Sequence, residues 1–220
     1  QTCALPIYLF LFFSNRERVY ILYTVYVFFS TIFNSFANGS AYHMPWFFYS
    51  INKVNMAMYP LLFGFFGMMF SVTYLELKKN APRLYMFNNI LYGLVGINFF
   101  IGFFAPHLAI TFVQINGILL AFFCIRCGNV VYRSGYKPAR FYLIGFGNYM
   151  ASLVIYIVFG LIDFNMQFPT YYFLMLGSAM EAIILSFAIG DKMNNAIREG
   201  ELANERALAA SKENEKLIME

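Results

Sequence analysis

The stretch LGSAMEAIILSFAIGDK, from Leu176 to Lys192, decides the fold of this chain. It begins as an apolar segment with one carboxylic acid, Glu181, in its middle, and it ends in charged residues. The sequence before it is strongly apolar, whereas the sequence after it is rich in Ala, Glu, Lys and Arg. This pattern predicts a helical junction between a membrane-embedded region and a water-exposed one.

The composition of the whole chain points to lipid as its main solvent. Of 220 residues, 60% are hydrophobic, 21% are aromatic and only 12% are charged, whereas a soluble domain is typically about 25% charged. A soluble domain of this length cannot bury so much apolar surface. The expected partner is therefore the lipid bilayer. The net charge of +4 does not indicate nucleic-acid binding, because the basic residues lie in the loops between apolar runs.

Six apolar runs have about the length of a spanning helix. Backbone polar groups find no partners in lipid, so these runs should be α-helices. Spanning strands would need alternating polar and apolar residues, which the run from Leu61 to Phe70 lacks. The predicted fold is all-α, a polytopic transmembrane helical bundle. The six expected complete spans are Val19–Phe36, Val54–Leu75, Leu84–Phe104, Leu108–Val131, Phe141–Ile162 and Tyr171–Ile189.

Loops rich and poor in basic residues alternate along the chain. The rich segments are Asn15–Arg18, Glu76–Arg83, Arg126–Arg140 and the tail from Lys192; the poor ones are Asn38–Lys53, Phe104–His107 and Asp163–Thr170. By the positive-inside rule, the rich loops and the C-terminal tail should be cytoplasmic. This alternation predicts both a multi-pass topology and its orientation.

The residues before the first complete span form an incomplete one. The apolar run Ile7–Phe13 is far shorter than the roughly 20 residues that a spanning helix needs. We expect residues 1–13 to be the truncated first span of seven, with residues 1–7 foreign to the gene. A short interfacial segment is the alternative interpretation.

The charged tail predicts a second unit. Residues 191–220 contain no Pro and one Gly, and their composition favours helix. Small and apolar residues recur there at spacings of three and four, which is typical of a thin coiled-coil seam. We expect residues 1–190 to form the transmembrane bundle and residues 191–220 a cytoplasmic coiled-coil helix that pairs in a homodimer. The expected seam comprises Ala196, Gly200, Ala203, Ala207, Ala210, Asn214 and Leu217.

Glu181 is the clear mid-span acid of this sequence. An ionisable group there costs about 2.5–3.5 kcal/mol on insertion scales, so it is a functional hypothesis by default. One interpretation is a gate that changes partner when the bundle rearranges, in a signal relay with Ser178 and Asp191. The other is a static hydrogen bond to a neighbouring helix. The candidate intramembrane contacts are Gln114, Asn116 and Asn148.

Glycines within the spans are expected to permit close contacts between helices rather than chemistry. They include Gly64, Gly67, Gly93, Gly96, Gly145 and Gly147.

Motifs for catalysis or metal binding are not evident. Cys124 and Cys127 match C-x-x-C, but a zinc site would need two further ligands nearby and a redox site usually lies in a thioredoxin-like context. We therefore expect no metal, no cofactor and no catalytic residue in this chain.

Five short landmarks occur in a fixed order along the sequence. They are Phe12–Arg18; Asn38, Gly39, Tyr42 and Trp46; Ala81–Leu84; Gly135–Phe141; and Gly177–Glu181 followed by Leu185–Asn194. In this order, on this topology, the chain resembles the 7TMR-DISM family, the bacterial seven-transmembrane receptors with diverse intracellular signalling modules. The resemblance runs from about Tyr8 to Asn194.

This resemblance implies a signalling receptor of the bacterial cytoplasmic (inner) membrane. Such proteins usually carry a ligand-binding domain before the first span. After the last span they carry an output module, such as a histidine kinase of a two-component system, a diguanylate cyclase or a phosphatase. Both would be missing from this chain, which would itself be no enzyme. The alternatives are a small transporter or intramembrane enzyme that uses Glu181, and a purely structural anchor.

Overall fold

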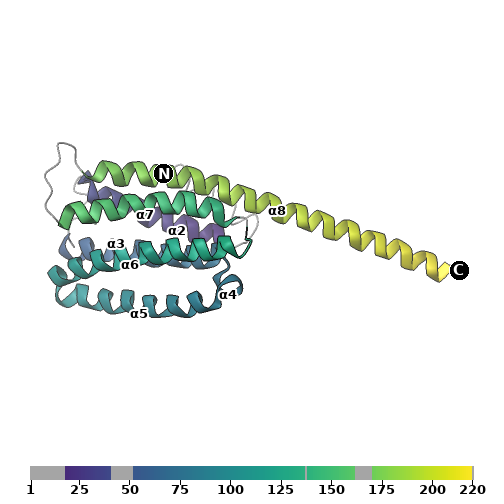
Figure 1. Ribbon diagram of the computed structural model, residues 1–220, viewed down its shortest axis with the longest axis horizontal. Helices are drawn as coiled ribbons and strands as arrows, with labels where there is room; N and C mark the ends of the chain where they lie inside the picture. Colours follow the sequence, from purple (N-terminus) through teal and green to yellow (C-terminus); the bar gives the residue numbers. More distant parts are fainter. Residues whose placement is uncertain (1–17, 41–51, 137, 162–169, 220) are drawn as a thin grey trace.

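The computed structural model describes residues 18–40, 52–136, 138–161 and 170–219, and every regular element in these ranges is a helix (Figure 1). The all-α prediction is therefore confirmed. The helices are α2 (Arg18–Ala37), α3 (Asn52–Tyr74), α4 (Leu77–Asn80), α5 (Pro82–Phe104), α6 (Pro106–Arg133), α7 (Ala139–Leu161) and α8 (Tyr171–Met219).

Each of the six expected spans coincides with one of the long helices. Five of these helices, α2, α5, α6, α7 and α8, are long and apolar enough to cross a membrane. In α3 the described side chains cover Met58–Tyr74, and this part of the helix is apolar. The expected truncated span in residues 1–13 lies outside the described residues.

Local sequence explains where several helices begin. Pro82 and Pro106 stand at the first positions of α5 and α6, where a missing N–H costs no helical hydrogen bond. Ala81 and Ala105 before them have extended φ angles of −151° and −141°. Glu76 adopts a left-handed φ of 49° between α3 and α4, which turns the chain sharply at the end of α3.

Five of the long helices form a closed ring. Their order around it is α8, α2, α3, α6 and α7, and α7 packs back against α8. The remaining long helix, α5, lies outside the ring and contacts α3, α4 and α6. Side chains such as Asn88 and Leu91 face this contact and are buried, whereas Ile90 and Ile97 on the other side of α5 are each 60% exposed.

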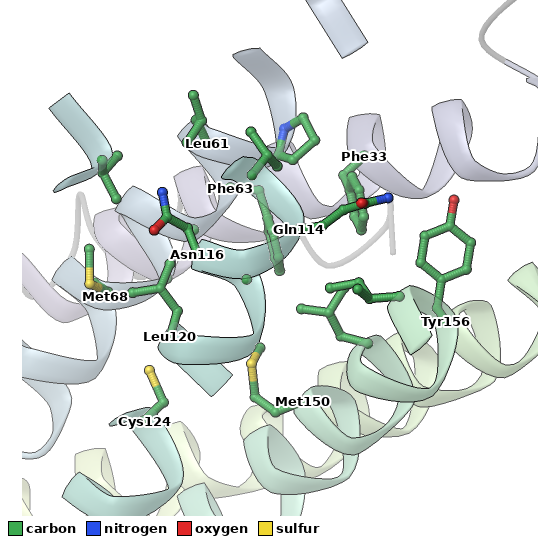
Figure 2. A pocket seen from close by; sticks show the side chains of 18 of the residues that line it. Phe33, Leu61, Phe63, Met68, Gln114, Asn116, Leu120, Cys124, Met150 and Tyr156 are labelled. Carbon is green, nitrogen blue, oxygen red and sulfur yellow. The ribbon is translucent and has the colours of Figure 1, made fainter. Parts of the chain in front are cut away.

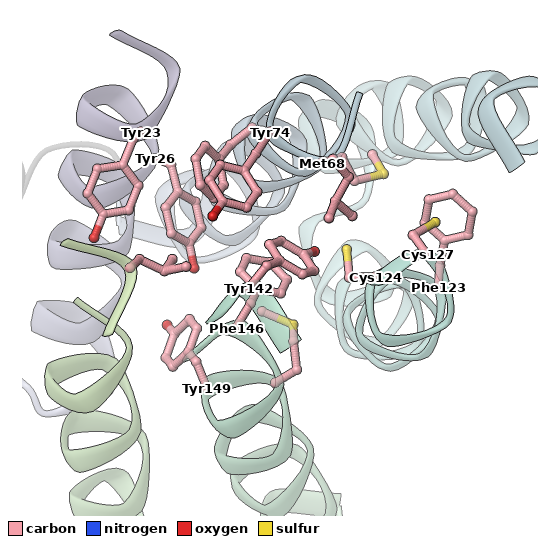
Figure 3. Packing of buried hydrophobic residues seen from close by; sticks show 14 of the residues in the cluster. Tyr23, Tyr26, Met68, Tyr74, Phe123, Cys124, Cys127, Tyr142, Phe146 and Tyr149 are labelled. Carbon is pink, nitrogen blue, oxygen red and sulfur yellow. The ribbon is translucent and has the colours of Figure 1, made fainter. Parts of the chain in front are cut away.

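Aromatic side chains fill part of the ring (Figure 3). The Tyr26 ring lies 5.3 Å from Phe63, 5.9 Å from Phe70 and 5.9 Å from Phe146, measured between centroids. Phe63 also contacts Tyr149 edge to face at 5.7 Å. These distances are typical of favourable aromatic pairs, so one cluster joins α2, α3 and α7.

Glycines mark close helix contacts within the ring but not on α5. A Cβ built at Gly177 would lie 2.6 Å from the Ser152 Cβ, so α7 and α8 approach closely there. The expectation for the six glycines proved correct for Gly64, Gly67 and Gly145, whose added Cβ atoms would lie 3.1 Å from a neighbouring side chain. It was wrong for the other three, which have no heavy atom within 4 Å of an added Cβ: Gly93, Gly96 and Gly147.

The end of the bundle from which α8 projects is basic. Arg18 begins α2, Arg83 lies in the first turn of α5, Arg133 ends α6 and Arg140 lies in the first turn of α7. We call this the basic end and refer to the other as the opposite end. Beyond the basic end α8 continues as a single straight projection away from the other helices (Figure 1).

Candidate functional site

Glu181 lies on the face of α8 that points into the ring. The buried residues of α8 recur every three or four positions, as one face of a helix requires: Leu174, Ser178, Glu181, Leu185 and Ala188. The opposite face is exposed to the surrounding medium, with Leu176 at 63% and Phe187 at 70%. Glu181 belongs to this buried face by its position in the helix, and its side chain is only 3% exposed.

The partner of Glu181 is a tyrosine of α2. The Tyr26 hydroxyl donates a hydrogen bond of 2.6 Å to Glu181 Oε1, and both residues are buried. Gly67 of α3 leaves room for this tyrosine, since a Cβ at that position would lie 3.1 Å from Tyr26 Cε2. The contact thus joins α8 to α2 within the aromatic cluster.

A second set of polar groups lies beside this contact. The Tyr149 hydroxyl of α7 is close enough to Glu181 to interact with it electrostatically, and it also lies near the side chains of Ser30 and Asn34. Neither that hydroxyl nor Asn34 Oδ1 makes a hydrogen bond of normal geometry. An unsatisfied buried polar group costs about 1–3 kcal/mol. Glu181 therefore has a second candidate donor, Tyr149, in addition to the one that it uses.

A further contact holds α8 at the basic end. Lys192 Nζ lies 3.4 Å from Glu76 Oε1 and 5.6 Å from the centroid of the Tyr74 ring. The Tyr136 hydroxyl donates to the same Glu76 oxygen at 3.4 Å. Since Glu76 is the residue with the left-handed backbone, the turn between α3 and α4 presents its carboxylate to α8.

The residues expected around Glu181 occupy other places. Ser178 Oγ donates to the Met175 carbonyl of its own helix at 3.0 Å, and Asp191 lies near Tyr74 at the basic end. Gln114 and Asn116 line a cavity, and the buried Asn148 Nδ2 has no hydrogen-bond partner. Among the described residues, Glu181 accepts from none of these three amides.

Tyr26 was not singled out from the sequence. It belongs to a series at three-residue spacing in α2, with Tyr20 and Tyr23, and all three side chains are buried. A hydroxyl that is buried in an apolar span needs a hydrogen-bond acceptor. That requirement is the signal that could have found it.

The expected seam lies on the projecting part of α8. Ala203, Ala207 and Ala210 are exposed in the single chain. The side chains of Ala196 and Leu217 are outside the described set. The seam therefore stays a prediction.

The described part of the chain contains no cluster of three or more His, Cys, Asp or Glu side chains that could hold a metal ion. Cys124 and Cys127 are buried free thiols, and Cys124 Sγ lies 3.9 Å from Ser71 Oγ. Around Glu181, the nearby Tyr26 and Tyr149 hydroxyls offer two candidate hydrogen-bond donors to its carboxyl group.

Comparison with known proteins gives one match. A family model described as 7TM diverse intracellular signalling, 7TMR-DISM_7TM, matches residues 4–192. The match ends at Lys192, where α8 leaves the bundle. No curated protein and no solved structure matches the chain.

Proposed function

Because this chain belongs to the 7TM diverse intracellular signalling family, we propose that it relays an extracytoplasmic signal to an output module. The signal would pass through α8 to a module beyond residue 220, such as a histidine kinase, a diguanylate cyclase or a phosphatase. The chain itself would be non-catalytic. Its helices suit a multi-pass membrane protein.

The observation that carries the proposal is the continuity of α8. It runs for 49 residues without a break, from inside the ring to Met219. The glycines along it, Gly177, Gly190 and Gly200, leave the helix uninterrupted. A rigid helix transmits rotation and translation, whereas a flexible linker would absorb them.

The proposed mechanism is a shift between two packings of the ring. In one packing Glu181 accepts from Tyr26, as described above. In the other it would accept from Tyr149, whose hydroxyl makes no hydrogen bond of normal geometry here. An external event that favours one packing would rotate or shift α8 relative to α2 and α7, since packed helices have discrete arrangements.

Orientation and pairing complete the proposal. By the positive-inside rule, we place the basic end on the cytoplasmic side of a bacterial inner membrane. A lone helix that projects into water is marginally stable, so we propose that two copies pair along the seam as a homodimer. A change in register between the paired helices would then be transmitted to the output module.

Cysteine crosslinking in membranes tests this relay. Single cysteines would be placed at each position from 201 to 210, after replacement of the native cysteines. The proposal requires strong crosslinks at Ala203, Ala207 and Ala210 and weak ones between them, with a pattern that differs between signalling states. Uniform crosslinking, or a pattern that no stimulus changes, would contradict it.

A transporter or intramembrane enzyme that uses Glu181 makes different demands. It would lose uptake or turnover in Glu181→Gln and would tolerate deletion of the tail. A relay would instead lose output when a flexible linker is inserted at Gly190 of the full-length parent. A structural anchor would keep its output when the bundle is exchanged for unrelated helices.

A further inference from the structure

A cavity of about 220 Å³ lies inside the ring. It is bounded by α2, α3, α6 and α7, with Val95 contributed by α5 (Figure 2). Phe36 and Ala37, at the end of α2, place part of it toward the opposite end, and Tyr26 and Cys124 lie deeper. Its walls are mostly apolar and include the rings of Phe33 and Phe63.

The lining restricts the chemistry of a ligand. It includes no Asp, Glu, Lys, Arg or His among the described residues, so a charged molecule would lose its hydration without compensation. Two amide side chains, Gln114 and Asn116, line the cavity, and both are partly buried. An apolar pocket with a few polar groups is the usual form of a small-molecule site.

The size of the cavity suits a single ring. An engineered apolar cavity of about 150 Å³ binds benzene, so a somewhat larger space accommodates a benzene ring with a polar substituent. Aromatic walls favour an aromatic guest, because offset and edge-to-face pairs add about 0.5–1.5 kcal/mol to burial.

We propose that this cavity binds an uncharged aromatic molecule that carries one hydroxyl or amide group. The ring of the ligand packs among Phe33, Phe63 and Met150, and its polar group hydrogen-bonds to the Gln114 amide. Phenol and its neutral derivatives are the simplest members of this class.

Occupancy of the cavity would reach α8 through one side chain. Tyr26 lines the cavity, and its hydroxyl donates to Glu181. A ligand that moves the Tyr26 ring therefore changes the contact between α2 and α8. This coupling depends on the proposed function, whereas the binding site does not.

Photolabelling in lipid nanodiscs tests the site. The probe is a phenol that carries a diazirine, and labelled peptides are identified by mass spectrometry. The expected result is labelling of the lining segments of α3, α6 and α7 that excess phenol reduces at least fivefold. Labelling confined to outward residues such as Phe122, or labelling that phenol does not reduce, would overturn the proposal.

Three variants, one of them a control, make the test specific. Val113→Phe narrows the cavity and should reduce the competable labelling at least fivefold, while Ile115→Phe on the exposed face of the same helix should leave it unchanged. Gln114→Leu keeps the volume but removes the amide. It should weaken phenol competition about five- to tenfold and leave competition by toluene unchanged. Equal behaviour of Val113→Phe and Ile115→Phe in folded protein would overturn the site, as would equal loss for phenol and toluene in Gln114→Leu.

Crosslinking then separates the site from the relay. If phenol competes for labelling and also changes the tail crosslinks, both the site and its coupling are supported. If phenol competes without changing any crosslink, the site stands and the coupling through Tyr26 is refuted. If tail crosslinks respond to another stimulus while labelling fails, the relay stands and the cavity proposal is refuted.

Discussion

Between Tyr171 and Lys192, α8 is one of five helices in a packed ring, whereas from Glu201 to Ala210 every side chain is exposed. Leu185 in the first region is 0% exposed, and Leu208 in the second is 59% exposed. Both regions belong to one unbroken helix. The difference shows that α8 keeps its backbone while its surroundings change completely.

This comparison separates two sources of helix stability. Inside the membrane the backbone hydrogen bonds of a helix have no competition from water, so any apolar sequence of sufficient length stays helical. In water an isolated helix is marginal and depends on packing. The neighbours of the first region therefore set its position, whereas the second region would gain stability from the second copy proposed above.

The largest effect is expected from truncation of a buried side chain in the ring. Leu185→Ala removes dispersion contacts and leaves a cavity, so it should lower the free energy of unfolding by about 2–4 kcal/mol. Leu208→Ala, on the exposed region of the same helix, should change it by less than about 0.5 kcal/mol. Unfolding in mixed micelles measures both changes in free energy. Equal losses for the two variants would contradict the difference in burial between Leu185 and Leu208.

The close approach of α7 and α8 gives the next effect. Gly177→Ala places a Cβ against Ser152 and should destabilise the bundle by about 1–3 kcal/mol. Ser152→Gly in the same chain should restore most of that loss. As a matched control, Gly190→Ala meets no neighbouring atom and should be neutral or stabilising by up to about 1 kcal/mol. The same unfolding assay applies, and destabilisation by Gly190→Ala alone would contradict the comparison.

Loss of the buried hydrogen bond between Tyr26 and Glu181 should have a smaller effect on stability. Tyr26→Phe should cost about 0.5–1.5 kcal/mol, because Glu181 loses its donor and hydrogen bonds between membrane helices are modest. In a double-mutant cycle with Glu181→Leu, the two losses should not add. Tyr132→Phe, on an exposed residue, is the control. Additive losses would show that the two side chains act independently.

The smallest effect is expected at the boundary between the two regions. Lys192→Met removes the ion pair with Glu76 and should cost no more than about 1 kcal/mol, because the Glu76 side chain is 39% exposed. The loss should shrink as salt rises. Lys79→Met, an exposed lysine of α4, serves as the control in unfolding measurements at low and high salt. A salt-independent loss would point to packing of the lysine stem instead.

The positions of the helices could largely be predicted from the sequence, but which helices pack against one another could not. Apolar run length predicts where helices lie, because it is a local property of the sequence. The order of helices around the ring depends on contacts between distant segments. Gly93 and Gly67 look alike in sequence, yet only Gly67 meets a neighbour, because α5 packs outside the ring.

Only one of the two residues of the candidate site could be predicted from the sequence. Glu181 stands out as an acid in an apolar span, which is a local property. Its donor, Tyr26, is 155 residues away and is one of several tyrosines in α2. Choosing it requires knowledge that α2 lies beside α8, with Gly67 leaving space for the ring.

The length of the projecting part of α8 has a mechanical consequence. From Lys192 to Met219 the helix extends about 40 Å at 1.5 Å per residue. If it moves as a stiff lever about the basic end, a tilt of roughly 5° at Lys192 displaces its far end by about 3.5 Å. An angular change too small to disturb the packing of the ring would thus become, at the tip, a displacement comparable to the width of an atom.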